Sequence, residues 1–186
     1  MRVRPGLRVM CGLGIILAAG AMSMTPAGAA GAQDDLPPVD VVEVSGLVDR
    51  IVADSISDSL ERARTNGSQA VILQVNTRGA VIGRAEMAKL LYDIRTSPTP
   101  VAVWVGPSGS RLYGLPAQIA AVSDVVAMAP GSRIGRAGTP LTVDGAQVSF
   151  GAADDILRSG TLGFREAREQ KVLRFAGTDE GVPVLR

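Results

Sequence analysis

Histidine is absent from this chain of 186 residues, and lysine and cysteine are scarce. Without histidine the chain can form neither a Ser-His-Asp triad nor a Cys-His dyad, and it lacks the usual imidazole ligands of zinc sites. Only two lysines are present, Lys89 and Lys171, so chemistry that depends on a lysine amine has two candidates. We therefore expect the chain to hold no metal and no cofactor.

Aromatic side chains are also rare, at 3% of the residues, whereas 46% of the residues are hydrophobic. Most of the apolar side chains are those of valine, isoleucine, leucine and alanine. Small and β-branched side chains of this kind favour helices packed closely on a sheet over a sandwich built on aromatic residues. The length suffices for one domain with a substantial core and is short for two.

The first 32 residues have the pattern of an export signal. A basic start with three arginines precedes an apolar run over residues 9–21, and small residues follow up to Ala32. Cleavage after Ala29 or Ala32 would satisfy the preference of signal peptidases for small residues. The alternative is an uncleaved anchor, although the apolar run is shorter than the roughly 20 residues of a spanning helix. We expect the protein to be exported, and to be secreted or attached to the outer face of the cytoplasmic membrane.

Removal of this segment leaves a linker over residues 33–38 and one domain over residues 39–186. These parts carry 16 basic and 18 acidic side chains, so their net charge is −2. They contain no cysteine, so no disulfide can stabilise them outside the cytoplasm. They also lack a basic stretch that could follow a phosphate backbone, and we expect no nucleic-acid partner.

Four short apolar segments predict the strands of a sheet. The first three begin at residues 39, 70 and 101, a spacing of 31 residues each time, with helical periodicity between them. This repeat predicts an α/β fold of strand–helix units with a mainly parallel central sheet. Residues 70–75 are apolar almost throughout, which is typical of a sheet buried on both faces. The expected strands are 39–44, 70–75, 101–105 and 125–128, and the expected helices are 49–66, one around 87–94, and 117–122.

The pattern is weaker after Pro140. Residues 141–150 are expected to be extended, residues 164–171 to form a short helix, and residues 172–175 to form a final strand. The chain then stops without a further helix. This ending leaves open a minimal domain or a fragment of something longer, truncated at its carboxyl end.

Three loops resemble those of a known family. Residues 76–80 read NTRGA, residues 101–111 read VAVWVGPSGSR, and residues 125–140 read VVAMAPGSRIGRAGTP. Together they resemble the NfeD-like membrane-associated serine proteases of the ClpP/crotonase superfamily, over about residues 39–174. The resemblance implies the ClpP/crotonase-like spiral of strand–helix units. It also implies a homo-oligomer whose partner is a peptide or a membrane-protein segment, with a stomatin-like protein as one candidate.

The residues that perform catalysis in this family are missing. The family's nucleophilic serine corresponds to Gly114, which has no oxygen to attack a carbonyl. The family's general base is a lysine after the A-P-G-T-x-I-G segment, and no lysine occurs between Gly135 and Gln170. Lys89 is expected to be a solvated charge on a helix, and Lys171 lies too late in the chain. We therefore predict a pseudoenzyme.

The backbone donors that would stabilise an oxyanion are preserved in part. By resemblance they are the N–H groups of Gly79, of Ala80 in place of the family's second glycine, and of Leu115 after the nucleophile position. Arg78 stands where the family has proline. These N–H groups could bind a peptide backbone even without catalysis.

Other arrangements remain as alternatives. Ser108 or Ser110 could act as a relocated nucleophile, but neither has an evident base, because the guanidinium groups nearby are donors only. A crotonase-type acyl-thioester enzyme would need no serine, but its acyl-CoA substrates are cytoplasmic. Asp154 and Asp155 are paired only in sequence, since successive residues of a helix do not face each other.

The leading hypothesis is an exported, catalytically inactive protein that binds an extended peptide. The peptide would add to an exposed strand edge. Arg133 and Arg136 flank the Ile134-Gly135 dipeptide, and we expect them to bind either acidic residues of the site itself or a peptide carboxylate.

Overall fold

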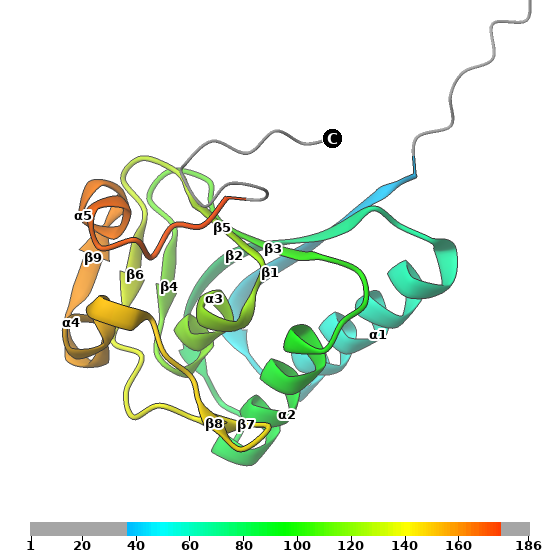
Figure 1. Cartoon of the computed structure of the whole chain (residues 1–186), viewed down its shortest axis with the longest axis horizontal. Helices are drawn as coiled ribbons and strands as arrows, with labels where there is room; N and C mark the ends of the chain where they lie inside the picture. The colour runs from blue at the N-terminus through cyan, green and yellow to red at the C-terminus, as the bar shows by residue number, and fades with distance from the viewer. Residues whose placement is uncertain (1–36, 176–186) are drawn as a thin grey trace, which may run out of the picture. The chain divides into compact units, whose positions relative to one another are not determined.

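The computed structural model describes residues 37–175 (Figure 1). The predicted export signal over residues 1–32, most of the predicted linker and the last residues of the chain lie outside the described part. The strands are β1 (Val39–Val48), β2 (Ala70–Ala80), β3 (Val101–Val105), β4 (Arg111–Tyr113), β5 (Val125–Met128), β6 (Arg133–Gly135), β7 (Thr142–Val143), β8 (Ala146–Gln147) and β9 (Thr161–Gly163). The helices are α1 (Arg50–Asn66), α2 (Arg84–Arg95), α3 (Ile119–Val122), α4 (Asp154–Ser159) and α5 (Phe164–Glu169), with 3₁₀ turns η1 (Leu115–Gln118) and η2 (Gly151–Ala153).

The long strand β2 organises the main sheet. Along one edge it pairs with β1 over nearly its whole length. Along the other edge it pairs first with β3, at residues 71–75, and then with β4, at Thr77. Beyond these strands the sheet continues through β5 on β3 and through β6 and β9 on β4. All strand pairs of this main sheet are parallel except β6 with β9, which confirms the predicted α/β class and its mainly parallel sheet.

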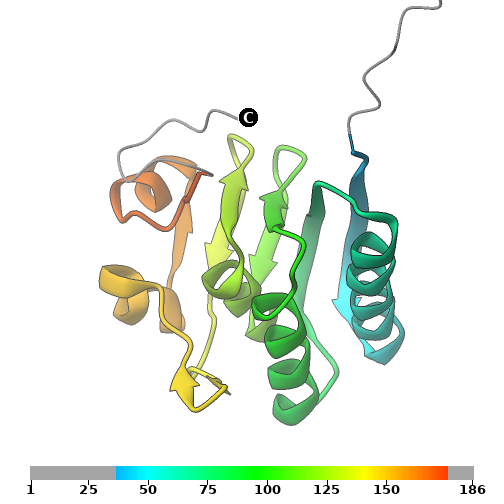
Figure 2. The ribbon, with the colours of Figure 1, turned by 45° about the vertical axis from the view of Figure 1, so that its right-hand side comes forward.

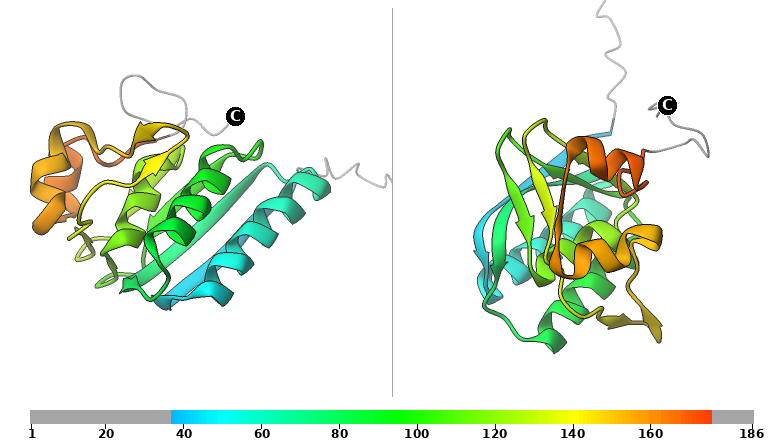
Figure 3. Two further views of the ribbon diagram at one scale, coloured as in Figure 1. Left: turned by 90° about the horizontal axis from the view of Figure 1, so that it is seen from below. Right: turned by 90° about the vertical axis from the view of Figure 1, so that its left-hand side faces the viewer.

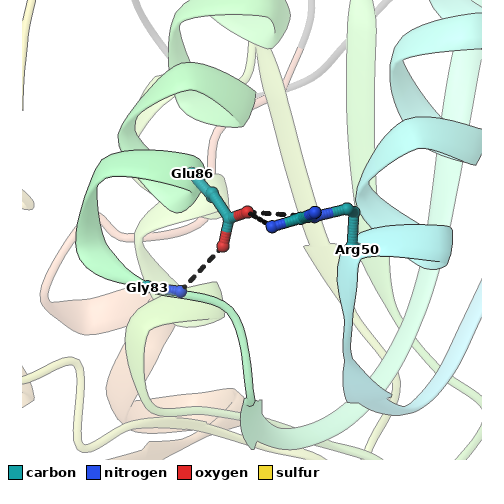
Figure 4. Close-up of polar contacts among 3 residues, drawn as sticks. All are labelled: Arg50, Gly83 and Glu86. Carbon is teal, nitrogen blue, oxygen red and sulfur yellow. Dashed lines mark hydrogen bonds and ion pairs between the residues drawn. The ribbon is translucent and has the colours of Figure 1, made fainter.

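The first two helices have the termini that the sequence predicts. The Asp49 carboxylate accepts a hydrogen bond from the Val52 N–H at 2.8 Å and so caps α1. Gly67, with φ of 67°, ends α1 in the left-handed conformation. At the start of α2 the Glu86 carboxylate accepts from the Gly83 N–H at 3.1 Å and also pairs with Arg50 of α1 (Figure 4). The hydrogen bond from Gly83, together with Arg50, holds the pKa of Glu86 below its usual value.

One face of the sheet is buried and the other is open. On β2 the side chains of Val71, Leu73 and Val75 are fully buried, whereas Ile72 between them is partly exposed. Its register partner on β1, Val41, is 62% exposed. Helices α1 and α2 lie on the same side of the strands, as Figure 2 shows. The prediction of burial on both faces is therefore wrong for the described residues, because these helices cover one face only.

The second half of the chain forms shorter elements. Helices α4 and α5 pack beside β9, at the end of the sheet opposite α1 (Figure 3). Residues 141–150 are extended as expected and contain the β7–β8 hairpin. The predicted helix over 117–122 begins earlier, as a 3₁₀ turn at Leu115.

The predicted strand over residues 172–175 does not form. This segment makes only an isolated bridge between Arg174 and Val126. The Arg174 side chain turns away to donate to the carbonyl oxygens of Ala120 and Ser123, at 2.5 and 2.6 Å. An arginine with two carbonyl acceptors beyond the edge of β5 anchors this segment without a regular ladder.

Candidate functional site

Three glycines from distant parts of the chain meet where β2, β4 and β6 end. The Gly114 N–H donates to the Gly135 carbonyl oxygen at 3.2 Å. A Cβ atom built on Gly114 would lie 3.2 Å from the Cα of Gly79. The carboxyl ends of parallel strands share one edge of a sheet, which is where α/β proteins place ligands. The structure thus brings Gly79 and Gly114 together, as the resemblance implies.

Gly114 has a conformation that few other residues adopt. Its φ of 73° and ψ of −157° lie in a region occupied almost exclusively by glycine. The atoms nearest to the built Cβ, apart from those of adjoining residues, are Gly79 Cα, Pro116 Cδ and the Arg78 carbonyl oxygen. None of these atoms is a hydroxyl or an amine that could take over the role of a nucleophile or a base.

The expected oxyanion donors occupy different environments. The Gly79 N–H is directed to the Thr77 hydroxyl at 3.3 Å, and this hydroxyl donates to the Gly79 carbonyl oxygen at 2.9 Å. Ala80 is the last residue of β2 and is the register partner of Val48. Leu115 is partly buried and opens η1, directly after Gly114. Gly79 and Leu115 therefore adjoin Gly114, and the N–H of Gly79 already has the Thr77 hydroxyl as its acceptor.

The two candidate serines hold loops together. The exposed Ser108 hydroxyl donates to the Pro130 carbonyl oxygen at 2.5 Å, which links the loop after β3 to the loop after β5. Ser110 is only 3% exposed, and its carbonyl oxygen accepts from the Arg133 N–H at 3.0 Å. The Ser108 hydroxyl thus has a structural contact between two loops, whereas Ser110 is buried and is linked to β6 through its backbone.

The charged candidates outside the three loops have ordinary surface roles. Lys89 pairs with Asp93 at 2.9 Å, and this hydrogen bond and the charge of Asp93 raise the pKa of Lys89. A lysine that is held more firmly protonated is a poor general base. The Asp154 carboxylate accepts from the Phe150 N–H at 2.6 Å, whereas Asp155 faces Arg158 at 3.7 Å. The two aspartates therefore do not form a catalytic pair.

Gln118 is a residue that sequence reasoning missed. Its side chain is 1% exposed, and its amide nitrogen donates to the carbonyl oxygens of Ala137 and Thr139 at 3.0 and 3.1 Å. Its amide oxygen accepts from the Leu141 N–H at 2.8 Å. From α2, Arg84 donates to the same segment, to Thr139 at 3.2 Å. The sequence signal for this role is that Gln118 is the one polar residue among the apolar residues 115–122. A polar side chain in such a segment is expected to be buried with hydrogen-bond partners.

The segments that carry these glycines contain four arginines: Arg78, Arg111, Arg133 and Arg136. Arg78 and Arg136 adjoin Gly79 and Gly135, whereas Arg111 and Arg133 begin β4 and β6. Arg111 of β4 and Arg133 of β6 are register partners in a parallel pair, so they share a face of the sheet. The Arg136 guanidinium lies 5.5 Å from the centre of the Tyr113 ring. No ion pair joins any of the four to an acidic residue between positions 37 and 175. The expectation that Arg133 and Arg136 bind acidic residues of the site itself is therefore wrong within the described residues.

Other features of the described residues lie away from this site. A groove of about 330 Å³ runs between β1 and α1, lined by polar side chains that include Asp40, Glu43 and Arg62. None of the candidate site residues lines it. Within residues 37–175 no cluster of three histidine, cysteine or acidic side chains could hold a metal ion, and no helix there could cross a membrane.

Comparison with known proteins identifies a homologue. No family profile matches the chain. The chain is 31% identical over 98 residues to the membrane-bound protease PH1510 of Pyrococcus horikoshii, a match that covers 52% of this chain and 22% of that protein. The chain therefore spans only about a fifth of the length of this relative.

Solved structures show the same fold. A mutant of the 1510-N membrane-bound stomatin-specific protease in complex with a substrate peptide superposes with a TM-score of 0.63 at 21% identity, covering 75% of this chain and 74% of that one. The 1510-N protease from Pyrococcus horikoshii superposes with a TM-score of 0.61 at 23% identity, covering 74% and 72%. An enoyl-CoA hydratase/isomerase family protein from Silicibacter pomeroyi has a TM-score of 0.56 at 16% identity, covering 73% and 70%. The resemblance to the NfeD-like proteases is thus confirmed: the chain is homologous to PH1510 and has the ClpP/crotonase-like fold.

Proposed function

We propose that this chain is an exported protease homologue that binds an extended peptide, or a segment of a membrane protein, without cleaving it. The observation that carries the proposal is Gly114. Gly114 follows β4 and lies against Gly79, and it is the position to which the resemblance assigns the family's nucleophilic serine. The proposed domain comprises residues 39–186.

Loss of the nucleophile alone would leave a general base in place, but the base is missing as well. No lysine occurs between Gly135 and Gln170, and Lys89 is paired with Asp93 at the surface of α2. Covalent acyl transfer needs both an attacking atom and a group that accepts its proton. Since both are absent, any remaining function of the site must rest on binding.

The relocated-serine alternative has little geometric support. The Ser110 side chain is buried, and the Ser108 hydroxyl is engaged with the Pro130 carbonyl oxygen. Neither serine is among the nearest neighbours of a side chain at Gly114. Attack by Ser108 would first require its hydrogen bond to the loop after β5 to break, and attack by Ser110 would require its side chain to become exposed.

Several features favour retention of a peptide site. The Leu115 backbone directly follows Gly114. A second, separate candidate surface is β1, on the other side of β2 from β4, which is paired along one edge only within the described residues. A free strand edge can accept an extended peptide as an additional strand. A structure of the related 1510-N protease contains a substrate peptide. By analogy with this protease, we propose that the partner of this chain is a stomatin-like protein. We also propose that the chain forms a homo-oligomer.

The proposed location is outside the cytoplasm. Its support is the export pattern of residues 1–32, together with the homology to PH1510, a membrane-bound protease. Sequencing of the amino terminus of protein isolated from each cell fraction tests it. We expect a terminus at Ala30 or Gln33 in the exported fraction, whereas intact Met1 in the cytosol alone would contradict export.

Activity and binding are tested separately with the purified protein. A fluorophosphonate probe labels activated serines, and we expect no labelling and no hydrolysis of fluorogenic peptides. Fluorescence anisotropy with a set of labelled peptides measures binding, and we expect saturable binding of at least one extended peptide. Labelling that is lost in Ser108→Ala or Ser110→Ala would establish the relocated nucleophile and refute the proposal. Absence of binding to every peptide would refute the binding function.

A further inference from the structure

The segments that form the candidate site carry positive charge without any negative charge. Residues 76–80, 105–118 and 129–141 contain four arginines, and they contain no aspartate and no glutamate. The described chain as a whole has nearly equal numbers of basic and acidic residues. The excess of positive charge in these three segments is therefore local to the candidate site.

The arginines lie on one face of three adjoining strands. Along β2, Thr77 is buried and Arg78 is exposed, and Thr77 is the register partner of Leu112. Alternation along the strands then places Arg78 on the same face as Arg111 and its register partner Arg133. Arg136 follows directly after β6. We call these four residues the arginine face.

Neutral acceptors orient two of the guanidinium groups. Arg111 donates to the carbonyl oxygens of Gly109 and Ser110, the latter at 3.2 Å. Arg133 donates to the Thr161 hydroxyl at 3.1 and 3.0 Å. A guanidinium has five N–H donors, so each keeps several donors for a further acceptor. The groups are thus held in place, and none of them forms an ion pair within the described residues. The nearby Glu166 carboxylate accepts from the Gly163 N–H instead.

Charged side chains elsewhere in the described chain are often compensated. The pairs are Arg50–Glu86, Arg64–Glu61, Lys89–Asp93 and Arg158–Asp155. Like charges that are gathered without a counter-ion repel each other, so an arrangement of this kind is stabilised when an anion binds. Carboxylates match the guanidinium fork and accept two parallel hydrogen bonds.

We propose that the arginine face selects acidic peptides, so that the extended segment bound beside Gly79 and Gly114 carries aspartate or glutamate side chains. This inference rests on the peptide-binding function proposed above and assigns its ligand class. An anionic membrane surface is the competing ligand. It is less favoured, because a membrane-binding surface needs exposed apolar side chains among its basic ones. The exposed Leu47 beside Gly79 belongs to β1, which β2 separates from β4. The neighbours of Arg111 and Arg133 on this face are Tyr113 and Thr161.

Binding of three labelled peptides of equal length, one acidic, one neutral and one basic, tests the assignment. We expect the acidic peptide to bind most tightly and its affinity to fall as the salt concentration rises. The double variant Arg78→Gln/Arg133→Gln should weaken binding of the acidic peptide by about threefold to tenfold for each arginine. The matched control is Arg165→Gln/Arg168→Gln, which removes the same charge from the exposed surface of α5 and should leave the affinity unchanged.

Each contrary outcome has a distinct meaning. Equal affinity for all three peptides would overturn the acidic preference and leave peptide binding intact. If both double variants lost the same amount of affinity for the acidic peptide, the cause would be a long-range effect of net charge. That result would overturn the assignment to the arginine face. Binding to phosphatidylglycerol vesicles, with no binding to any peptide, would identify the face as a membrane surface and overturn both proposals. The salt dependence of the unaltered protein keeps the test decisive even if a variant fails to fold.

Discussion

Restoring a serine at Gly114 should destabilise the protein without creating an active enzyme. Gly114 has φ of 73° and ψ of −157°, and a residue with a side chain in this region carries about 1–3 kcal/mol of backbone strain. The added Cβ would also lie 3.2 Å from the Gly79 Cα, which is closer than an ordinary contact. We therefore expect Gly114→Ser to lower the free energy of unfolding by about 1–3 kcal/mol. For a domain of this size, each kcal/mol corresponds to a fall in Tm of about 2–4 °C.

The chemical part of the prediction follows from the missing base. A positioned general base typically contributes about 10²–10⁴-fold to the rate, and none of the atoms nearest to the new side chain could act as one. Gly114→Ser should therefore neither hydrolyse fluorogenic peptides nor react with a fluorophosphonate probe above the level of the unaltered protein. The control is Gly114→Ala, which adds the same Cβ without the hydroxyl.

Thermal unfolding and peptide hydrolysis of the three proteins decide the matter. We expect similar losses of stability in Gly114→Ser and Gly114→Ala, because both result from the Cβ atom and the backbone conformation. Substantial hydrolysis by Gly114→Ser would show that a base is present and that the reasoning on the missing lysine is wrong. Unchanged stability in both variants would show that a residue with a side chain at position 114 is not strained.

Two further predictions concern stability. Gln118→Ala should lower the free energy of unfolding by about 2–4 kcal/mol, since it leaves the buried carbonyl of Ala137 and the buried N–H of Leu141 unpaired. Chemical denaturation measures this loss. The control is Gln147→Ala, which changes an exposed glutamine and should cause almost no loss. Glu86→Gln should reduce Tm at pH 7 and have little effect near pH 2. The lowered pKa of Glu86 means that its contribution is complete above the unfolded-state pKa and disappears as the pH falls through the folded-state value. A Tm difference between Glu86→Gln and the unaltered protein that is the same at both pH values would contradict the assignment.

Much of the fold follows from local features of the sequence. The equal spacing of the apolar segments at 39, 70 and 101 predicts strands that the structure contains, and their parallel pairing agrees with the helices between them. Asp49 and Gly67 delimit α1 through interactions with neighbouring residues, which makes its ends predictable. The absence of a serine at Gly114 and of a nearby lysine is likewise a property of the sequence.

The short strands depended on tertiary contacts. β4, β6 and β9 have three residues each, too few for an apolar period, and they exist because β2 continues past β3 and offers its edge to β4. The segment at Arg174 contains apolar residues on either side and reads as a strand, but its arginine bonds to the end of α3 instead. Pairing partners far away in the chain decided these cases, and local pattern carries no information about them.

Some features of the candidate site are likewise determined by the sequence, and others only by the tertiary structure. Residue identity at positions 79, 114 and 115 determined which backbone groups were candidates and which chemistry was lost. Only the folded chain brings Gly79 to Gly114, gives Gly114 its positive φ and buries Gln118 against the segment at 137–141. The arginine face also required the register of three strands, because sequence distance cannot show that Arg78, Arg111 and Arg133 share a face without an acidic partner among the described residues. Composition and periodicity are local properties of a chain, whereas the register of parallel strands is set by contacts between residues far apart in sequence.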